Sequence, residues 1–265
     1  SSMKTALTIA GSDCSGGAGI QADLKTIAAH RLYGMSVITA LTAQNTLGVQ
    51  RVLPIGADFV TAQLDSIFTD IYPDSVKIGM IPDLSVAQAI VACLRHFEAK
   101  NIVIDPVMAS SSGQILSRTD SLQFLLQHLF PLARLITPNL PEMEILCGFP
   151  IVNQKAMVQG AQSLFSVLHV PILVKGGHLV QNEAADLLYD GYEFHWFSHA
   201  RLQNPNTHGT GCTLSSAIAC NLANGLSLKD SVARAKEYVT SAIAAGLRLG
   251  HGCGPLNHMY KDMSH

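Results

Sequence analysis

The segment TALTIAGSDCSGGAGIQADLK, residues 5–25, decides the fold class. It begins with Thr5–Ala10, a short apolar run that predicts a buried strand, and continues into a glycine-rich turn. Short apolar runs alternate with longer amphipathic stretches along most of the remaining chain. The further strands that this pattern predicts are Ser36–Thr42, Val76–Ile78, Ile102–Ile104, Leu135–Thr137 and Ile172–Val174. Strands that are apolar on both faces and separated by helices predict an α/β fold with a mostly parallel sheet between two helical layers.

The pattern changes near residue 185, where two strand-like runs flank a turn. The runs are Asp186–Tyr189 and Phe194–Ser198, and the turn between them is Asp190-Gly191. This arrangement predicts an antiparallel hairpin at one edge of the sheet. Two amphipathic helices are expected to follow, at about residues 212–224 and 228–249.

Signals for helix ends and for domain boundaries are sparse. Asp58 and Ser85 are the expected N-caps of two helices, and Pro141 stands where the first turn of a helix tolerates proline. The sequence contains no internal repeat and no Pro/Ser linker, which favours a single domain over residues 3–265. The two serines before Met3 are interpreted as a remnant of an expression tag.

Composition excludes several classes of protein. Apolar residues make up 48% of the chain and charged residues 14%, which argues against an intrinsically disordered protein. The formal charge of −2 and the scattered lysines and arginines argue against a nucleic-acid partner held by bulk electrostatics. The sequence shows no signal peptide and no apolar run of about 18 residues, so we expect no membrane partner and a cytoplasmic location.

Cysteine usage and the low content of charge add two weaker expectations. The six cysteines include no CxxC pair, which predicts reduced thiols rather than a disulfide framework. The low charge leaves an apolar surface that a second copy could cover, so we expect a homo-oligomer, most simply a homodimer.

The residues that follow each predicted strand are the candidates for chemistry, because ligands of open parallel sheets bind beyond the carboxyl ends of the strands. These positions are polar or rich in glycine. They are Gly11-Ser12-Asp13, Gly16–Gly19, Gln44-Asn45, Gly79-Met80, Asp105–Met108, Pro138-Asn139 with Glu142, Lys175–Gly177 and Gly209–Cys212.

The segment NTHGTGC, residues 206–212, precedes one of the predicted helices. Glycines at a helix start let an anion approach the backbone N–H groups, and the helix dipole attracts it. A phosphate site and a tight turn with glycines at positive φ both fit this pattern. Cys212 is expected in the first helical turn, where the dipole lowers a thiol pKa, and an inert buried cysteine is the alternative.

Other candidates also have two interpretations. Lys175 ends an apolar strand, where it could contact a phosphate or extend to the surface. Asp105 and Glu142 could position Mg²⁺ or cap helices. Because the sequence has no Gly-Lys dipeptide, it has no P-loop, and Gly16–Gly19 lacks the GxGxxG spacing. A dinucleotide-dependent oxidoreductase is therefore disfavoured.

Taken together, these motifs closely resemble the hydroxymethylpyrimidine kinase/phosphomethylpyrimidine kinase family of thiamin biosynthesis. The resemblance runs from Lys4 to about Pro255 and is carried by the segments ALTIAGSD (6–13), SGGAGIQADLKT (15–26), TALTAQNT (39–46), KIGM (77–80), DPVM (105–108), TPNLPE (137–142), KGGH (175–178) and THGTGC (207–212). It implies a ribokinase-like three-layer α/β/α fold. The implied activity is transfer of the ATP γ-phosphate to a hydroxymethyl group, and then of a second phosphate to the resulting ester.

The resemblance also implies a role for each candidate residue. Gln44 reads the pyrimidine, since its amide can accept from the exocyclic amine and donate to the adjacent ring nitrogen. The other implied positions are Gly11, Asp23, Met80 and Val107 around the pyrimidine; Lys175, Asn139 and Thr207 on ATP; Asp105 and Glu142 on the metal; and Gly209, Thr210 and Gly211 in the anion hole, where Lys175 also acts on the transferring phosphate. Cys212 is the implied base, as a thiolate, at a position where the wider superfamily has aspartate.

ATP and Mg²⁺ are the implied cofactors, with dependence on K⁺ left open. The implied small-molecule partners are hydroxymethylpyrimidine and its monophosphate. A pyridoxal or pyridoxine kinase shares most of these motifs and is the nearest alternative. A non-catalytic nucleotide- or pyrimidine-binding protein is a second, although Lys175, Glu142 and Cys212 are all present.

Overall fold

The computed structural model describes residues 2–108, 119–177, 184–199 and 209–262. Within these residues a single sheet has the strand order β3-β2-β1-β4-β5-β6-β7-β8-β9. Neighbouring strands from β2 to β7 pair in parallel, whereas β3, β8 and β9 are antiparallel to their neighbours. The strands are β1 (Thr5–Asp13), β2 (Tyr33–Asn45), β3 (Gly48–Pro54), β4 (Ser75–Ile78), β5 (Ile102–Ile104), β6 (Leu135–Ile136), β7 (Ile172–Lys175), β8 (Ala184–Tyr189) and β9 (Phe194–His199).

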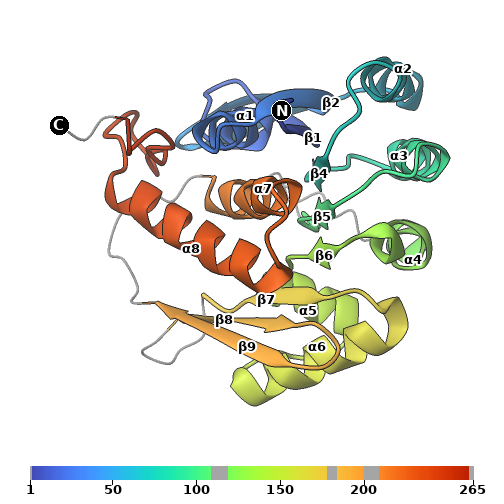
Figure 1. Cartoon of the computed structure of the whole chain (residues 1–265), viewed down its shortest axis with the longest axis vertical. Helices are drawn as coiled ribbons and strands as arrows, with labels where there is room; N and C mark the ends of the chain where they lie inside the picture. The colour runs from blue at the N-terminus through green and yellow to red at the C-terminus, as the bar shows by residue number, and fades with distance from the viewer. Residues whose placement is uncertain (1, 109–118, 178–183, 200–208, 263–265) are drawn as a thin grey trace.

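Helices cover both faces of the sheet, as Figure 1 shows, with α1, α7 and α8 on one side and α2, α3 and α4 on the other. The helices are α1 (Gly19–Ala29), α2 (Ala57–Phe68), α3 (Leu84–His96), α4 (Thr119–Phe124), α5 (Leu140–Cys147), α6 (Gln154–Leu168), α7 (Thr210–Ala223) and α8 (Leu228–Ala244). A π-helical turn, Leu125–Leu129, and a 3₁₀ turn, Phe130–Leu132, continue α4. The expected three-layer α/β/α architecture is therefore confirmed.

Alternation along the strands divides the core between the two layers. Ile102 and Ile104 of β5 pack in the cluster that contains α2, α3 and α6, whereas Val103 packs against α7 and α8. Successive side chains of a strand point to opposite faces, so a strand that is apolar at every position buries both. The same alternation decides to which face of the sheet the side chain of Lys77 in β4 points.

The predicted strands and the hairpin are confirmed, with one omission. Strand β2 extends beyond the predicted Ser36–Thr42, and its far end pairs with β3, which the sequence analysis did not predict. Exposed residues dominate β3, so it lacks the apolar run on which the other strands were recognised. The two late helices are also confirmed, although α8 ends at Ala244, five residues before the expected end at 249.

Both predicted N-caps are wrong. Helix α2 begins after Gly56, so Asp58 lies inside its first turn. Helix α3 is capped by Asp83, whose carboxylate accepts the backbone N–H of Val86, while Ser85 donates its hydroxyl to the same carboxylate. An acidic side chain two residues earlier thus takes the place expected for the serine. Pro141 does lie in the first turn of α5, as predicted.

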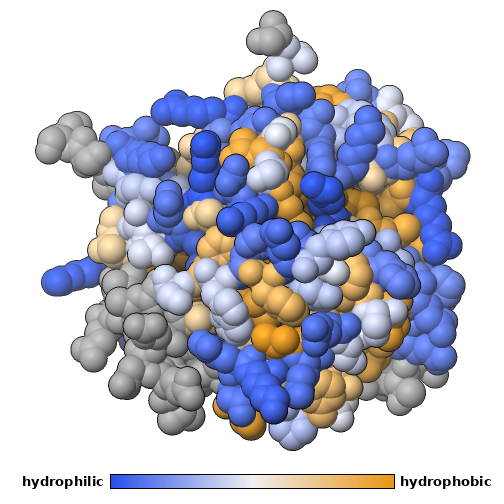
Figure 2. Space-filling model, turned by 60° about the horizontal axis from the view of Figure 1, so that its bottom comes forward, coloured by the Kyte–Doolittle hydropathy of each residue, from blue (hydrophilic) through white to orange (hydrophobic). Residues whose placement is uncertain are grey.

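Figure 2 shows polar and apolar side chains interspersed over the face that it presents. Large apolar residues that are exposed on β2, β3 and the turn between them include Leu41, Leu47 and Leu53. All six cysteines are free thiols, as expected. Among the helices described here, none has the length and apolarity needed to cross a membrane.

Candidate active site

The glycine-rich loop after β1 packs against the start of α7. Gly209 is the N-cap residue of α7 and adopts a left-handed backbone conformation with a φ of 82°. A Cβ atom at this position would lie 2.0 Å from the carbonyl oxygen of Gly17. Glycine is therefore required for this close approach, which places residues 16–19 beside residues 209–212.

Asp13, the last residue of β1, holds the glycine-rich loop in its conformation. Its carboxylate accepts the backbone N–H groups of Ser15, Gly17 and Ala18 at 2.9, 3.1 and 2.8 Å. Because Asp13 is almost completely buried, these charge-assisted hydrogen bonds make the loop rigid. The sequence analysis gave Asp13 no role of its own, although an acid directly before a glycine-rich turn favours such bonds.

Lys175 and Asp105 face the N-terminus of α7. Lys175 Nζ lies 3.3 Å from Asp105 Oδ1, with side chains that are 17% and 6% exposed. A Cβ on Gly211 would lie 3.4 Å from both Lys175 Nζ and Asp105 Oδ2. Burial alone would lower the pKa of Lys175, but Asp105 and Glu142 raise it, so the ammonium stays charged. A cation, a carboxylate and a helix N-terminus thus converge on one point.

Asn139 and Glu142 form a capping box at the start of α5. Asn139 Oδ1 accepts the backbone N–H of Glu142 at 2.9 Å, and Glu142 Oε1 accepts that of Asn139 at 3.0 Å. A parallel bridge joins Asn139 to Lys175, so this cap lies beside the lysine. The capping interpretation of Glu142 is therefore confirmed.

Glu142 also shares its surroundings with Asp105. Burial raises the pKa of Glu142 to about 7, and the negative charge of Asp105 contributes to the rise. Two partly buried carboxylates that repel each other are the oxygen donors that a hard cation such as Mg²⁺ prefers. The residues present therefore fit a divalent cation in addition to the cap.

The residues expected around the pyrimidine lie at the ends of neighbouring strands. Gln44 is the penultimate residue of β2 and accepts the hydroxyl of Thr42 at 3.1 Å through Oε1. Gly11 of β1 is adjacent to Met80, because a Cβ on Gly11 would lie 3.0 Å from Met80 Sδ. Val107 lines a small recess together with Asp105. The strand order places these groups on four neighbouring strands, although Gly11 pairs with Ala40, so Gln44 lies four residues further along β2.

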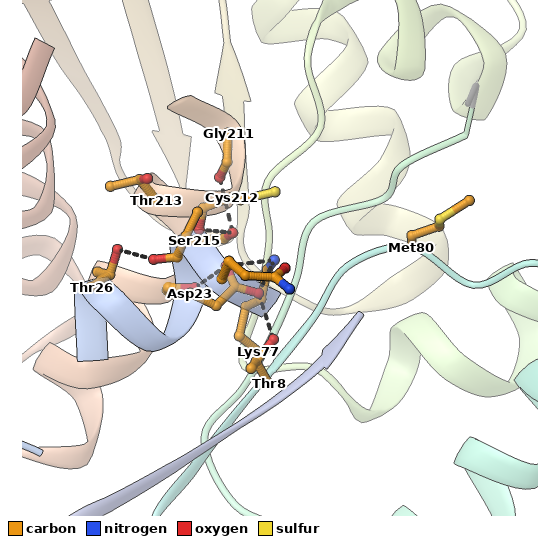
Figure 3. A network of polar contacts seen from close by, with 12 residues as sticks. Thr8, Asp23, Thr26, Lys77, Met80, Gly211, Cys212, Thr213 and Ser215 are labelled. Atoms are coloured by element: carbon orange, nitrogen blue, oxygen red, sulfur yellow. Dashed lines mark hydrogen bonds and ion pairs between the residues drawn. The ribbon is translucent and has the colours of Figure 1, made fainter. Parts of the chain in front are cut away.

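The structure corrects the expected place of Asp23 in the pocket wall. Asp23 is 0% exposed and forms an ion pair with Lys77, whose Nζ lies 3.0 and 2.8 Å from its two oxygens. The hydroxyls of Thr8 and Ser216 also donate to this carboxylate, and Figure 3 shows the network, from which Met80 points away. Protein donors thus occupy both oxygens of Asp23. Through these contacts Asp23 ties α1 to β1, β4 and α7.

Lys77 is the functional candidate that the sequence analysis missed. Its side chain is only 1% exposed. Burial alone would lower its pKa, but Asp23, with smaller contributions from Cys212 and Asp105, raises that pKa overall, so Lys77 carries a charge inside the protein. The signal was a lysine within a strand that was predicted to be covered on both faces, a place where an unpaired charge is not tolerated.

Cys212 lies in the first turn of α7, as expected, but the expectation of a low thiol pKa is wrong. Burial raises the pKa of Cys212, because desolvation disfavours the thiolate. Lys77 and a hydrogen bond from the backbone of Gly19 lower it in part, while Asp23 and Asp105 raise it further. Thr207, the remaining predicted site residue, lies outside the described residues.

The sequence profile of the phosphomethylpyrimidine kinase family matches residues 13–257 of the chain. Over 97% of both chains, it is 46% identical to the hydroxymethylpyrimidine/phosphomethylpyrimidine kinase of Rhizobium meliloti. It is 47% identical to the thiamine biosynthesis bifunctional protein ThiED of Geobacter sulfurreducens over 96% of this chain, which spans about half, 52%, of that longer protein.

Among solved structures, an ADP complex of Bacillus subtilis pyridoxal kinase superposes with a TM-score of 0.91. The match covers 99% of this chain and 100% of that one at 37% sequence identity. The same architecture therefore occurs in a relative that is named for a different vitamin substrate.

Proposed function

The chain belongs to the phosphomethylpyrimidine kinase family, and from this we propose that it phosphorylates 4-amino-5-hydroxymethyl-2-methylpyrimidine with ATP, first to the monophosphate and then to the diphosphate, in thiamin biosynthesis. The observation that carries the proposal is the convergence of Lys175, Asp105 and Gly211 at the start of α7. Such an arrangement neutralises the charge of a transferring phosphoryl group. The phosphotransferase class follows from the family, and the acceptor is the one for which its members are named.

At the phosphate end, Lys175 contacts the phosphates of ATP as a fixed positive charge. The backbone of Gly209, Thr210 and Gly211 forms the anion hole at the N-terminus of α7. Asn139 holds the adjoining loop through its bridge to Lys175. Asp105 and Glu142 are the residues that would hold Mg²⁺, which supplies charge neutralisation of the phosphates when it is bound.

At the acceptor end, Cys212 takes the proton of the hydroxymethyl group as the oxygen attacks the γ-phosphorus. Burial favours the neutral thiol in the absence of substrates, so the thiolate needs local positive charge. Gln44 pairs with the edge of the aminopyrimidine, while Gly11, Met80 and Val107 pack around the ring. Asp23 is not part of this surface, because it is buried in its ion pair with Lys77.

A pyridoxal kinase is the second candidate, favoured by the match to the Bacillus subtilis enzyme. Gln44 favours the aminopyrimidine, because its amide can accept from an exocyclic amine that pyridoxal lacks. A non-catalytic binding protein is disfavoured, since Lys175, Glu142 and Cys212 are all retained.

A homodimer remains part of the proposal, as does a cytoplasmic location. The antiparallel pairing of the end of β2 with β3, residues 40–54, forms a β2–β3 extension at one edge of the sheet. Its exposed Leu47 and Leu53 support the dimer, because a second copy can cover apolar side chains at an exposed sheet edge. Light scattering on the purified protein measures this, and a monomer at micromolar concentration contradicts it.

The decisive experiment for the function measures ATP consumption with hydroxymethylpyrimidine or pyridoxal as acceptor, with the products resolved by mass. We expect rapid formation of the pyrimidine monophosphate, then the diphosphate, and slower turnover of pyridoxal. Preference for pyridoxal by kcat/KM would support the second candidate. ATP consumption that does not depend on either acceptor would contradict both.

A further inference from the structure

A fully buried lysine beside the candidate base has no role in the chemistry described so far. Lys77 and Asp23 are 1% and 0% exposed, and the two hydroxyls of Thr8 and Ser216 complete the hydrogen bonding of Asp23. Burying two charges is expensive even when they are paired, and an apolar pair of similar volume is often at least as stable. Stability alone is therefore a weak explanation for this pair.

The direction of Lys77 follows from the strand that carries it. Val76 and Ile78, its neighbours in β4, pack in the cluster that contains α2 and α3. Since side chains alternate along a strand, Lys77 points to the opposite face, which α1 and α7 cover. Thr8 is its register partner on β1 and points the same way.

Helix α7 connects this ion pair to Cys212. Ser216 donates its hydroxyl to Asp23 Oδ1 at 2.7 Å. Cys212 precedes Ser216 by four residues, and residues at that spacing lie on the same face of a helix. Cys212 thus faces the same side as the Lys77–Asp23 pair, one turn closer to the anion hole, and Figure 3 shows it beside them.

The charged groups around Cys212 come from several elements. Lys77 lies on β4, Asp23 on α1 and Asp105 after β5, and Lys175 lies close to the neighbouring Gly211. Lys77 lowers the pKa of the Cys212 thiol, while Asp23 and Asp105 raise it. Lys77 is therefore a positive charge that acts directly on this thiol from within the protein.

We propose that Lys77, held by Asp23 beneath the first turns of α7, is the counter-charge that stabilises the thiolate of Cys212. The proposal rests on the role of Cys212 as the base in the proposed function. In that step the thiolate takes the proton of the hydroxymethyl oxygen as that oxygen bonds to the γ-phosphorus and the bond from phosphorus to the ADP oxygen breaks. Lys77 keeps its proton throughout and is a positioning residue rather than a catalytic one.

The test measures the pH dependence of alkylation of Cys212 by iodoacetamide, quantified at the level of the Cys212 peptide by mass spectrometry. In Lys77→Met combined with Asp23→Asn, which leaves no uncompensated buried charge, the midpoint should move to higher pH. In Lys77→Met alone, which leaves the charge of Asp23 to oppose the thiolate, it should move further in the same direction. A neighbouring opposite charge shifts a pKa by about one to three units, which sets the scale for Lys77→Met alone. The shift in the combined variant should be smaller, because the opposing effect of Asp23 is removed together with that of Lys77.

The matched control removes a second buried pair, Lys236 with Asp186, which ties α8 to β8. Lys236→Met combined with Asp186→Asn should leave the Cys212 midpoint unchanged. Circular dichroism establishes that each variant is folded, and should Lys77→Met alone not fold, the combined variant, which leaves no buried charge unpaired, decides by the direction of its shift.

Equal midpoints in wild type and in the folded Lys77 and Asp23 variants would overturn the proposal. Alkylation requires neither ATP nor pyrimidine, so this result is independent of whether the protein phosphorylates hydroxymethylpyrimidine. Where that activity is present, the acidic limb of kcat/KM for the pyrimidine should shift with the alkylation midpoint.

Discussion

Two lysines extend from the parallel sheet toward α7, and their surroundings differ sharply. Lys77 of β4 lies 2.8 Å from Asp23 in a pair that is essentially inaccessible to solvent. Lys175 of β7 lies 3.3 Å from Asp105, and 17% of its side chain is exposed. The first pair is closed by hydroxyl donors from β1 and α7, whereas the second lies beside the glycines that begin α7.

The difference separates two uses of the same residue pair. A lysine whose charge is fully satisfied can act on its neighbours only through its field. A lysine at the rim can exchange its carboxylate for a phosphate of the substrate. We therefore propose that Lys77 supports the site from inside the protein and that Lys175 contacts ATP.

Breaking the buried pair should produce the largest loss of stability. Lys77→Met leaves the charge of Asp23 buried without its partner, and such a change costs about 3–5 kcal/mol of unfolding free energy. Urea denaturation followed by circular dichroism measures the loss, and adding Asp23→Asn should restore much of it. A single variant as stable as wild type would contradict this assignment of a charged, mutually dependent pair.

Breaking the pair of Lys175 and Asp105 at the rim of the site should instead reduce activity. Lys175→Met removes a preorganised charge from the transferring phosphate, and the loss of one such group lowers kcat by about 10²–10³-fold. Both phosphorylation steps should suffer, while the loss of stability should be smaller than for Lys77→Met. Steady-state kinetics and urea denaturation on one preparation compare the two effects, and the reverse ranking would contradict the assignment.

Recognition of the pyrimidine should depend on neither lysine. Gln44→Leu removes both hydrogen-bonding groups of the amide, and each buried group left unpaired on the substrate costs about 1–3 kcal/mol. The loss should appear in kcat/KM for the pyrimidine, with little change in KM for ATP. Equal damage toward both substrates would indicate that Gln44 serves the fold of the β2–β3 extension.

The smallest expected effect concerns the pH dependence of stability near Lys175. Burial and the charge of Asp105 raise the pKa of Glu142 to about 7 from an ordinary value of 4.5, so folding favours its protonated form. Between these two values the unfolded chain loses this proton first, and the contribution of Glu142 to stability is lost as pH rises.

Glu142→Gln keeps an oxygen that can accept the N–H of Asn139 and removes the titration. Thermal denaturation without nucleotide or metal at several values between pH 4.5 and 7 should therefore show a weaker decline with pH in the variant than in wild type. Identical slopes would place the carboxylate in contact with solvent.

Much of the fold could be predicted from the sequence, because its strands are apolar on both faces and glycines follow the ends of several strands. Strand β3 could not, since an exposed edge strand lacks that pattern. The N-cap of α3 was misplaced because Asp83 and Ser85 are both capping residues, and the choice between them depends on where the chain enters the helix.

The sequence predicted several of the residues that lie together at the site. It did not predict how neighbours in the fold change the burial and the pKa of those residues. Lys175, Asp105 and the glycines of α7 lie together as their positions after strands implied. The burial of Asp23 was not foreseen, because its partners Lys77 and Ser216 are distant in sequence and meet it only in the fold. The pKa of Cys212 was misjudged for the same reason, since desolvation depends on packing rather than on position in a helix.

We propose that one site, with Cys212 as base, performs both transfers. The first acceptor is a hydroxymethyl group, which must lose a proton to attack phosphorus, whereas the second is an anionic phosphate, which needs no base. Assaying each step separately in Cys212→Ala, with purified monophosphate for the second, tests this most directly. We expect the first transfer to slow by about 10²–10⁴-fold, the usual contribution of general-base catalysis, and the second far less. Equal slowing of the two steps would contradict the assignment of Cys212 as the base.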